Sequence, residues 1–409
     1  MVTDTQLNRP AAPPRSRDNI FNLLRLCLAI MVIFSHSYPT LRGISVLDPT
    51  AHLLRDQKDL PFYHAIDAGL LAVYGFFAIS GYLVTMSWQN SRGLRDYLKK
   101  RVLRICPGFA AAYLISVLVA GRLMALYPEQ YFHEVLAGKK ELLLQLVLLK
   151  LPWTPPLQND AVINGSLWTI SFEFWCYLVV AALGTAAFLS RRILPRVVVQ
   201  AAPALLFAFT YVVYCAHCAG HLLGTLGLMD GHLRSLESSR WVERIVFISP
   251  GNAVSWSRQF VYFAAGMCLY LYRDTLLNRR ALVYVSVAVL AASVALVPAL
   301  AYTLPIFGAY ALIALCLVPS RTLAQVGRKA DLSYGLYLYA FPVQQVLVLY
   351  FGRHLTPVTL FLVALALTAV FATASWFGVE KPFLSLKPKG RLPDTVAAAP
   401  VAAPQGAVI

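Results

Sequence analysis

The apolar stretch from Leu24 to Pro39 contains two residues that lipid disfavours, Arg25 and His36. They stand eleven positions apart, so a helix places them on nearly the same face, about 16 Å apart along its axis. Ionisable residues inside a membrane usually line a cavity, and neutral histidine can accept a proton near pH 7. The pair therefore predicts a shared polar path. The alternatives are an arginine that snorkels to lipid phosphates and a histidine bonded to the backbone.

Two further arginines, Arg101 and Arg104, lie three positions apart in the sequence YLKKRVLRICPGF. Residues at this spacing face the same way on a helix. Guanidinium groups match phosphate oxygens with two parallel hydrogen bonds. The pair is interpreted either as a phosphate-binding site or as basic residues that anchor a helix at the cytoplasmic face of a membrane.

A carboxylate, Glu173, interrupts the apolar sequence NGSLWTISFEFWCYL. Ser166 can cap this helix, which would place Glu173 about two turns inside it. A carboxylate within a membrane is costly unless it is paired or functional. The predicted depth is comparable with that of His36, so Glu173 is predicted to orient the His36 imidazole, with a structural ion pair as the alternative.

The composition indicates a helical membrane protein, whose helices must position these residues. Of the 409 residues, 58% are hydrophobic and only 13% are charged. A helix needs about 20 apolar residues to cross a bilayer. Ten stretches reach or approach this length: 20–38, 66–87, 104–125, 167–190, 195–215, 257–272, 281–299, 302–318, 333–351 and 357–378. The predicted fold is an all-α polytopic bundle of about ten spans. The shorter stretch 141–153 is predicted to be a re-entrant or interfacial helix.

The formal net charge is +16, and with ten spans every basic loop cluster falls on one side of the membrane. The positive-inside rule makes that side cytoplasmic and places both termini there. No nucleic-acid-binding motif is present, so no nucleic acid is predicted as a partner. The chain is divided into a disordered polar tail (1–18), a membrane domain (19–385) and a disordered Ala/Pro-rich tail (386–409), both tails being cytoplasmic.

The seven cysteines do not predict a disulfide framework, because their number is odd and most lie within apolar stretches. The sequence CAHCAGH brings together Cys215, His217, Cys218 and His221. A structural zinc site would need a second ligand pair at suitable spacing, and none follows. No metal is predicted.

Six motifs, in this order, resemble the acyltransferase 3 family of multi-pass membrane O-acyltransferases that modify bacterial polysaccharides and related acceptors. The resemblance covers roughly residues 18–385. The motifs are RLCLAIMVIFSHSYP, YGFFAISGYLVTMSW, KKRVLRICPGF, SLWTISFEFWCYL, DLSYGLYLYAFPV and ASWFGVEKPF.

The resemblance implies catalytic roles for His36 and Glu173, and binding of the acyl-CoA co-substrate by Arg25, Arg101 and Arg104. His36 would remove the acceptor hydroxyl proton or briefly carry the acyl group. The family's close-packing motif corresponds to Phe76, Phe77, Ser80, Gly81 and Tyr82.

One position departs from the family, because many members carry a histidine before the proline of the ninth span. This chain has Phe341 before Pro342. No catalytic role for that histidine can therefore be transferred to this protein.

The resemblance implies transfer of an acyl group from cytoplasmic acyl-CoA to a hydroxyl of a glycan or glycoconjugate. It implies that the group is acetyl and that the acceptor lies at the outer face of the bacterial cytoplasmic membrane. The expected partners are acyl-CoA, the carbohydrate acceptor and lipid. The competing hypothesis is a transporter or polysaccharide exporter that uses the buried Arg, His and Glu for proton coupling. Transporters often contain paired repeats, and no second copy of the Arg25/His36 pattern occurs.

Overall fold

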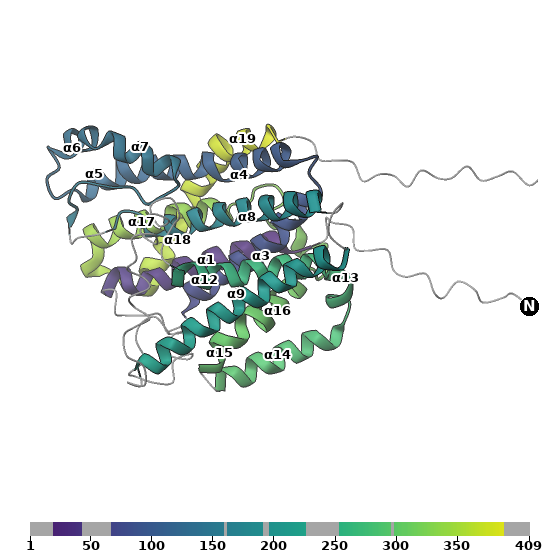
Figure 1. Cartoon of the computed structure of the whole chain (residues 1–409). Coiled ribbons are helices and arrows are strands. Elements are labelled where there is room, and N and C mark those ends of the chain that lie inside the picture. The colour runs from purple at the N-terminus through teal and green to yellow at the C-terminus, as the bar shows by residue number, and fades with distance from the viewer. Residues whose placement is uncertain are drawn as a thin grey trace, which may run out of the picture.

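The protein is a bundle of helices that run side by side (Figure 1). The computed structural model describes residues 19–42, 67–158, 162–190, 196–225, 253–295 and 298–387. Within these ranges the regular structure is helical, and the prediction of an all-α fold is confirmed. The predicted tail at 1–18 lies outside the described residues, as does all but the start of the tail at 386–409.

The longer helices carry most of the bundle. They are α1 (Phe21–Arg42), α3 (Ala68–Gln89), α4 (Leu94–Ile115), α8 (Trp168–Ser190), α9 (Arg196–Thr225), α12 (Ala253–Leu271), α14 (Arg280–Ala295), α17 (Ser333–Phe351) and α18 (Pro357–Ser375). The shorter ones are α5 (Gly121–Met124), α6 (Tyr131–Ala137), α7 (Lys139–Val147), α13 (Arg273–Leu276), α15 (Pro298–Thr303), α16 (Ala309–Cys316) and α19 (Lys381–Ser385).

Short turns of other helical types connect some of these elements. Three π-helical turns, η2 (Ser116–Ala120), η5 (Leu304–Gly308) and η8 (Trp376–Glu380), join α4 to α5, α15 to α16 and α18 to α19. The 3₁₀ turn η4 (Gly165–Leu167) leads directly into α8.

Seven helical stretches among the described residues are long and apolar enough to cross a membrane. They are Phe21–Leu41, Ala68–Gln89, Leu94–Met124, Gly165–Ala187, Ala299–Cys316, Ser333–His354 and Pro357–Ser385. The other three predicted spans coincide with α9, α12 and α14 but are not among the seven. The apolar parts of α9 and α14 are shorter, Ala201–Ala216 and Arg280–Val294. The predicted multi-pass architecture is therefore supported, whereas the count of ten is not.

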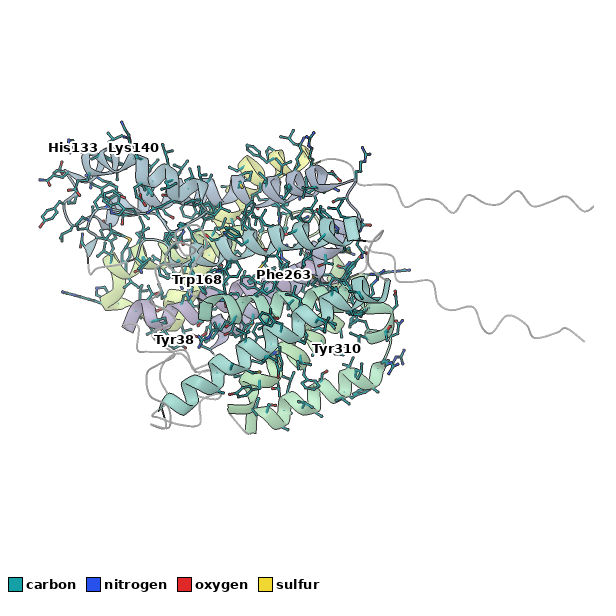
Figure 2. The ribbon with its side chains drawn as sticks, viewed as in Figure 1. Tyr38, His133, Lys140, Trp168, Phe263 and Tyr310 are labelled. Atoms are coloured by element: carbon teal, nitrogen blue, oxygen red, sulfur yellow. The ribbon has the colours of Figure 1, made fainter. Side chains whose placement is uncertain are left out.

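The predicted short helix at 141–153 corresponds to α7, which has nine residues and is too short to span a bilayer. It packs with α6 beside the end of α4. The Tyr113 hydroxyl donates to the carbonyl of Leu142 at 3.0 Å, and the Tyr131 hydroxyl donates to that of Val117 at 2.7 Å. His133 and Lys140 mark this pair of helices at the edge of the molecule in Figure 2.

The centre of the bundle is formed by α3, which contacts α1, α8 and α12. Figure 1 shows α4 and α8 on one side of this centre and α9, α14 and α16 on the other. The start of α3 is fixed by Asp67, whose side chain accepts a hydrogen bond from the Leu70 backbone N–H at 2.6 Å. This bond satisfies one of the free amides of the first turn.

Two glycines let α3 and α12 approach each other backbone to backbone. A Cβ atom at Gly81 would lie 2.0 Å from the carbonyl oxygen of Phe263, and one at Gly266 would lie 2.0 Å from that of Ala78. Small residues at a crossing are the usual way for membrane helices to gain close packing. Phe263, fully buried beside this crossing, is labelled near the middle of the molecule in Figure 2.

Replacing Gly81 with alanine should lower stability, because the new methyl group would collide with the α12 backbone and overpacking costs about 1–3 kcal/mol. The matched control is Gly378→Ala, since a Cβ there meets nothing within 4 Å. Alanine also favours a helix over glycine. Thermal unfolding in detergent should show a lower midpoint for Gly81→Ala and an unchanged or higher one for Gly378→Ala. Equal midpoints would contradict a tight crossing.

Candidate functional site

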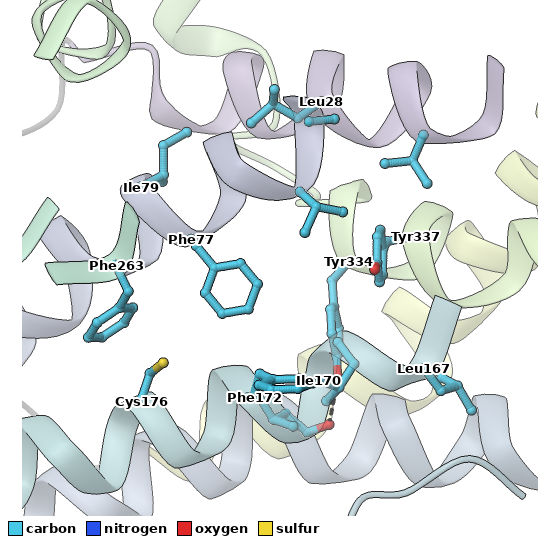
Figure 3. Packing of buried hydrophobic residues seen from close by; sticks show 14 of the residues in the cluster. Leu28, Phe77, Ile79, Leu167, Ile170, Phe172, Cys176, Phe263, Tyr334 and Tyr337 are labelled. Atoms are coloured by element: carbon cyan, nitrogen blue, oxygen red, sulfur yellow. Dashed lines mark hydrogen bonds between the residues drawn. The ribbon is translucent and has the colours of Figure 1, made fainter. Parts of the chain in front are cut away.

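A cavity lies among α1, α3, α4, α8 and α17, and its empty space, the part open to the surroundings included, is about 750 Å³. Residues predicted from the sequence form much of its wall: Arg25, Phe76, Phe77, Ser80, Arg101, Arg104 and Glu173. Figure 3 shows Phe77 of α3, Ile170 of α8 and the tyrosines of α17 around this region. The structure therefore brings together side chains from five helices, from α1 near the start of the chain to α17 near its end.

One end of the cavity, here called the arginine end, carries Arg25, Arg101 and Arg104. Arg25 and Arg104 both bind the Oδ2 atom of Asp331, at 2.8 and 2.5 Å. The Ser333 hydroxyl donates to the other oxygen of Asp331 at 2.6 Å. Burial by itself would raise the pKa of Asp331, but the charges of Arg25 and Arg104 hold this pKa well below its usual range. The bridging carboxylate is therefore ionised at neutral pH.

Arg101 is less completely satisfied than the other two arginines. Its Nη2 donates to the Ser87 hydroxyl at 2.9 Å, and its guanidinium lies 5.6 Å from the ring centroid of Tyr177. Its Nε is buried and has no hydrogen-bond partner within the described part of the chain. Arginine has five N–H donors, so Arg101 retains donors for a further oxygen-rich group.

The positive charge of the arginine end extends to Lys387, which follows α19. Burial, together with the nearby charges of Arg104, Arg101 and Arg25, lowers the pKa of Lys387 to about 7. Burial is the largest cause of this shift, and the neighbouring cations add to it.

Glu173 lies on the α8 wall of the cavity. Its Oε1 atom accepts hydrogen bonds from the Ser80 hydroxyl at 2.9 Å and from the Tyr177 hydroxyl at 2.6 Å. The bond from Ser80 connects α8 to α3, the bond from Tyr177 lies within α8, and together they fix the carboxylate on the cavity surface. The sequence interpretation identified Glu173 as a functional residue within the membrane but not these two partners.

The expected contact between Glu173 and His36 is absent. A Cβ at Gly69 would touch Ser35, which neighbours His36, whereas Glu173 binds Ser80, eleven residues further along α3. Eleven residues of helix correspond to about 16 Å. The Glu173 carboxylate therefore lies far from the imidazole of His36 and cannot orient it directly.

The physical reason is the position at which α8 begins. A Cβ at Gly165, just before α8, would lie 2.9 Å from the ring of Phe341, and the same ring lies edge-on to His36. The start of α8 is therefore level with His36. Glu173, two turns further along α8, lies correspondingly deeper.

His36 itself is half-buried outside the cavity wall. Its ring centroid is 5.4 Å from that of Phe341, with the two rings nearly perpendicular. The Nδ1 atom of His36 is buried and has no hydrogen-bond partner among the described residues. Phe341, the residue before Pro342, is thus the side chain whose ring packs against His36.

The opposite end of the cavity, here called the tyrosine end, is formed by Thr169 and Tyr337. Their hydroxyl oxygens are 2.6 Å apart, and the Phe76 ring centroid lies 5.8 Å from that of Tyr337. Figure 3 shows Tyr337 beside Tyr334 on α17. Tyr337 and Phe341 are four positions apart on α17, so they share a face one turn apart. The cavity therefore ends about one helical turn from the level of His36.

The rest of the close-packing motif divides between the cavity and the core. Phe76, Phe77 and Ser80 line the cavity, whereas Gly81 lies at the crossing with α12. Tyr82 is not part of the cavity wall, and its ring stacks on the ring of Phe21 with 5.5 Å between their centroids.

The CAHCAGH sequence lies on α9. Cys215 and Cys218 are free thiols, and the side chains of His217 and His221 are outside the described structure. Among the described residues, no group of three or more His, Cys, Asp or Glu side chains could hold a metal ion.

Sequence reasoning missed Asp331, Thr169 and Tyr337. An available signal for Asp331 was its position directly before an apolar helix, where an unpaired carboxylate would be costly. The hydroxyl residues gave no comparable signal, because Thr and Tyr are common within membrane helices.

Replacing Asp331 with asparagine should destabilise the protein by about 3 kcal/mol, because the half-buried guanidiniums of Arg25 and Arg104 would lose their shared counter-ion. The matched control is Asp274→Asn, since the Asp274 side chain is 86% exposed and its ion pair is 3.8 Å long. Thermal unfolding in detergent should show a large loss only for Asp331→Asn. Because the native pKa of Asp331 is lowered, this difference should persist from neutral pH to about pH 4 and shrink below it. Similar midpoints for both variants would contradict the bridging role.

Similarity to known proteins identifies the family of this chain. A protein-family model described as an acyltransferase domain matches residues 18–377. An O-acetyl transferase of Shigella phage Sf6 is 26% identical over 377 residues, which cover 90% of this chain and 97% of the phage protein. No solved structure matches the chain significantly. The match over most of the chain establishes that this protein belongs to the acyltransferase 3 family.

Proposed function

We propose that this protein is a membrane O-acyltransferase that moves an acyl group, most simply acetyl, from acyl-CoA to a hydroxyl of a glycan or glycoconjugate. The observation that carries the proposal is the cavity itself. It begins at a cluster of three arginines and ends about one turn from His36. The phosphates of the donor would thus bind at one end of the cavity, and its thioester would reach the end nearest to His36.

The arginine end suits the phosphates of CoA. Arg101 has unused donors, and the Asp331 carboxylate holds Arg25 and Arg104 close together. Guanidinium groups held in this way bind phosphate oxygens with strong charge-assisted hydrogen bonds. The lowered pKa of Lys387 is consistent with a site where added negative charge is favourable.

The length of the cavity suits an extended arm. Its α3 wall runs from Val73 to Val84, eleven residues apart, which corresponds to about 16 Å. Bound by its phosphates at the arginine end, the CoA arm would extend past Glu173 toward the tyrosine end. Its thioester would then lie on the side of the cavity nearest to His36.

His36 is the natural base for the acceptor. Neutral imidazole can take the proton of a hydroxyl as the oxygen attacks the thioester carbonyl. The unpartnered Nδ1 of His36 leaves the ring free to serve this role. Short-lived attachment of the acyl group to His36 is the alternative route.

The remaining assignments extend the family relationship. The phage relative is an O-acetyl transferase, which favours acetyl as the transferred group. The positive-inside rule, applied to the basic loop clusters, supports an arginine end on the cytoplasmic side and His36 toward the outer side, and the membrane we propose is the bacterial cytoplasmic membrane. The donor would then be cytoplasmic acetyl-CoA and the acceptor a carbohydrate at the outer face.

Replacing His36 with alanine should reduce acyl transfer by at least 100-fold, because the acceptor would lose its base. The matched control is His354→Ala, since His354 is exposed on a turn after α17. The measurement is release of CoA from acetyl-CoA by purified protein in the presence of membrane glycolipid, with product mass determined by mass spectrometry. Full activity of His36→Ala would remove His36 from the mechanism. Movement of substrate with no loss of acetyl-CoA would favour the transporter hypothesis instead.

Replacing Arg101 with glutamine should raise the KM for acetyl-CoA about tenfold or more, because a charge-assisted bond to phosphate is worth about 1.5–3 kcal/mol. The control is Arg95→Gln, which removes an exposed arginine of the same helix. Steady-state kinetics should show the rise only for Arg101→Gln. An unchanged KM would place the phosphates elsewhere.

A further inference from the structure

We infer that the hydroxyl of Tyr337, held in place by Thr169, donates a hydrogen bond to the thioester carbonyl of the acyl donor and stabilises the oxyanion formed during transfer. This inference depends on the proposed function. It adds a catalytic residue, Tyr337, and a positioning residue, Thr169, neither of which was indicated by the sequence.

The first argument is position. Tyr337 and Thr169 line the cavity at the end opposite the arginines. Tyr337 lies one turn from Phe341, the ring that packs against His36. A carbonyl at this end would therefore be near the histidine that activates the acceptor.

The second argument is the shortage of other donors at this end. The neighbouring wall residues, Val73, Phe76 and Ile170, have no polar side-chain atoms. The charged groups of the cavity belong to its other half, where Glu173 already accepts two hydrogen bonds. Among the described side chains of the wall, the paired hydroxyls are thus the donors closest to the His36 side.

The third argument is the count of protons. Each hydroxyl has one proton and can also accept. If Thr169 donates to Tyr337 at 2.6 Å, the Tyr337 proton remains available, and no other acceptor for it is found among the described residues. In the reverse direction Tyr337 would donate to Thr169, and Thr169 would donate to the carbonyl of Ser166 at 3.5 Å, which is a long bond. A bound thioester carbonyl would supply the acceptor that the Tyr337 proton lacks in the first direction, so that direction is the one we expect with the donor bound.

The reaction step balances as follows. The acceptor oxygen forms a C–O bond to the thioester carbon while its proton passes to His36. The carbonyl oxygen becomes an oxyanion that accepts the hydrogen bond of Tyr337. Collapse breaks the C–S bond, and the CoA thiolate takes the proton from the imidazolium. Donors held ready for an oxyanion in a site of low polarity commonly supply a large part of catalysis.

The test is Tyr337→Phe, compared with Tyr339→Phe as the matched control. Tyr339 is a buried tyrosine of the same helix whose hydroxyl bonds Ser375 at 3.1 Å, away from the cavity wall. We expect kcat with acetyl-CoA to fall about 100-fold or more in Tyr337→Phe, with affinity for the unreactive thioether S-ethyl-CoA unchanged. Tyr339→Phe should retain the kcat of the unaltered protein.

A second pair of variants tests the role of Thr169. Thr169→Val should lower kcat while leaving thioether affinity intact, and Thr169→Ser, which keeps the hydroxyl, should restore it. This pair decides the matter if Tyr337→Phe fails to fold. Equal kcat in Tyr337→Phe and Tyr339→Phe, or in Thr169→Val and Thr169→Ser, would overturn the inference. Absence of acetyl-CoA turnover in the unaltered protein would instead overturn the proposed function.

Discussion

The interaction on which the site depends is the bridge that Asp331 forms between Arg25 and Arg104. It joins the starts of α1 and α17 to α4, at 2.8 and 2.5 Å. Two guanidiniums would repel each other in a setting of low polarity, and one carboxylate shared between them removes much of that cost. Because the carboxylate is shared, each arginine keeps most of its donors for a ligand. The same contact thus stabilises the bundle and prepares an anion site.

The distances within the site follow from helical geometry. Arg25 and His36 belong to one helix, and eleven residues fix their separation at about 16 Å. The α3 wall spans the same length between Val73 and Val84. The close crossing at Gly81 and Gly266 holds α3 against α12, so the wall cannot easily shift along the bundle. Rigid helices therefore set the reach required of any donor that connects the two ends.

The sequence predicted helices well and their relative depths poorly. Apolar length located the helices that carry Arg25, Arg101, Glu173 and Phe341, because lipid requires long apolar segments. Placing Glu173 beside His36 failed, because the depth of a residue depends on where its helix begins relative to its neighbours. That level is set by contacts such as Gly165 against Phe341, which no single helix encodes. The bond from Ser80 on α3 to Glu173 likewise arises only from packing between helices, whereas Tyr177 lies four residues further along α8 itself.

The observed position of Glu173, away from His36, changes what this carboxylate can do in the site. Beside His36 it would have raised the basicity of the imidazole. Bonded to Ser80 and Tyr177 near Arg101, it instead offsets part of the positive charge along the wall that a donor must pass. His36 is then left without a carboxylate partner among the described residues, in contact with the apolar ring of Phe341. The neutral form of the imidazole is the one able to accept a proton from an incoming hydroxyl.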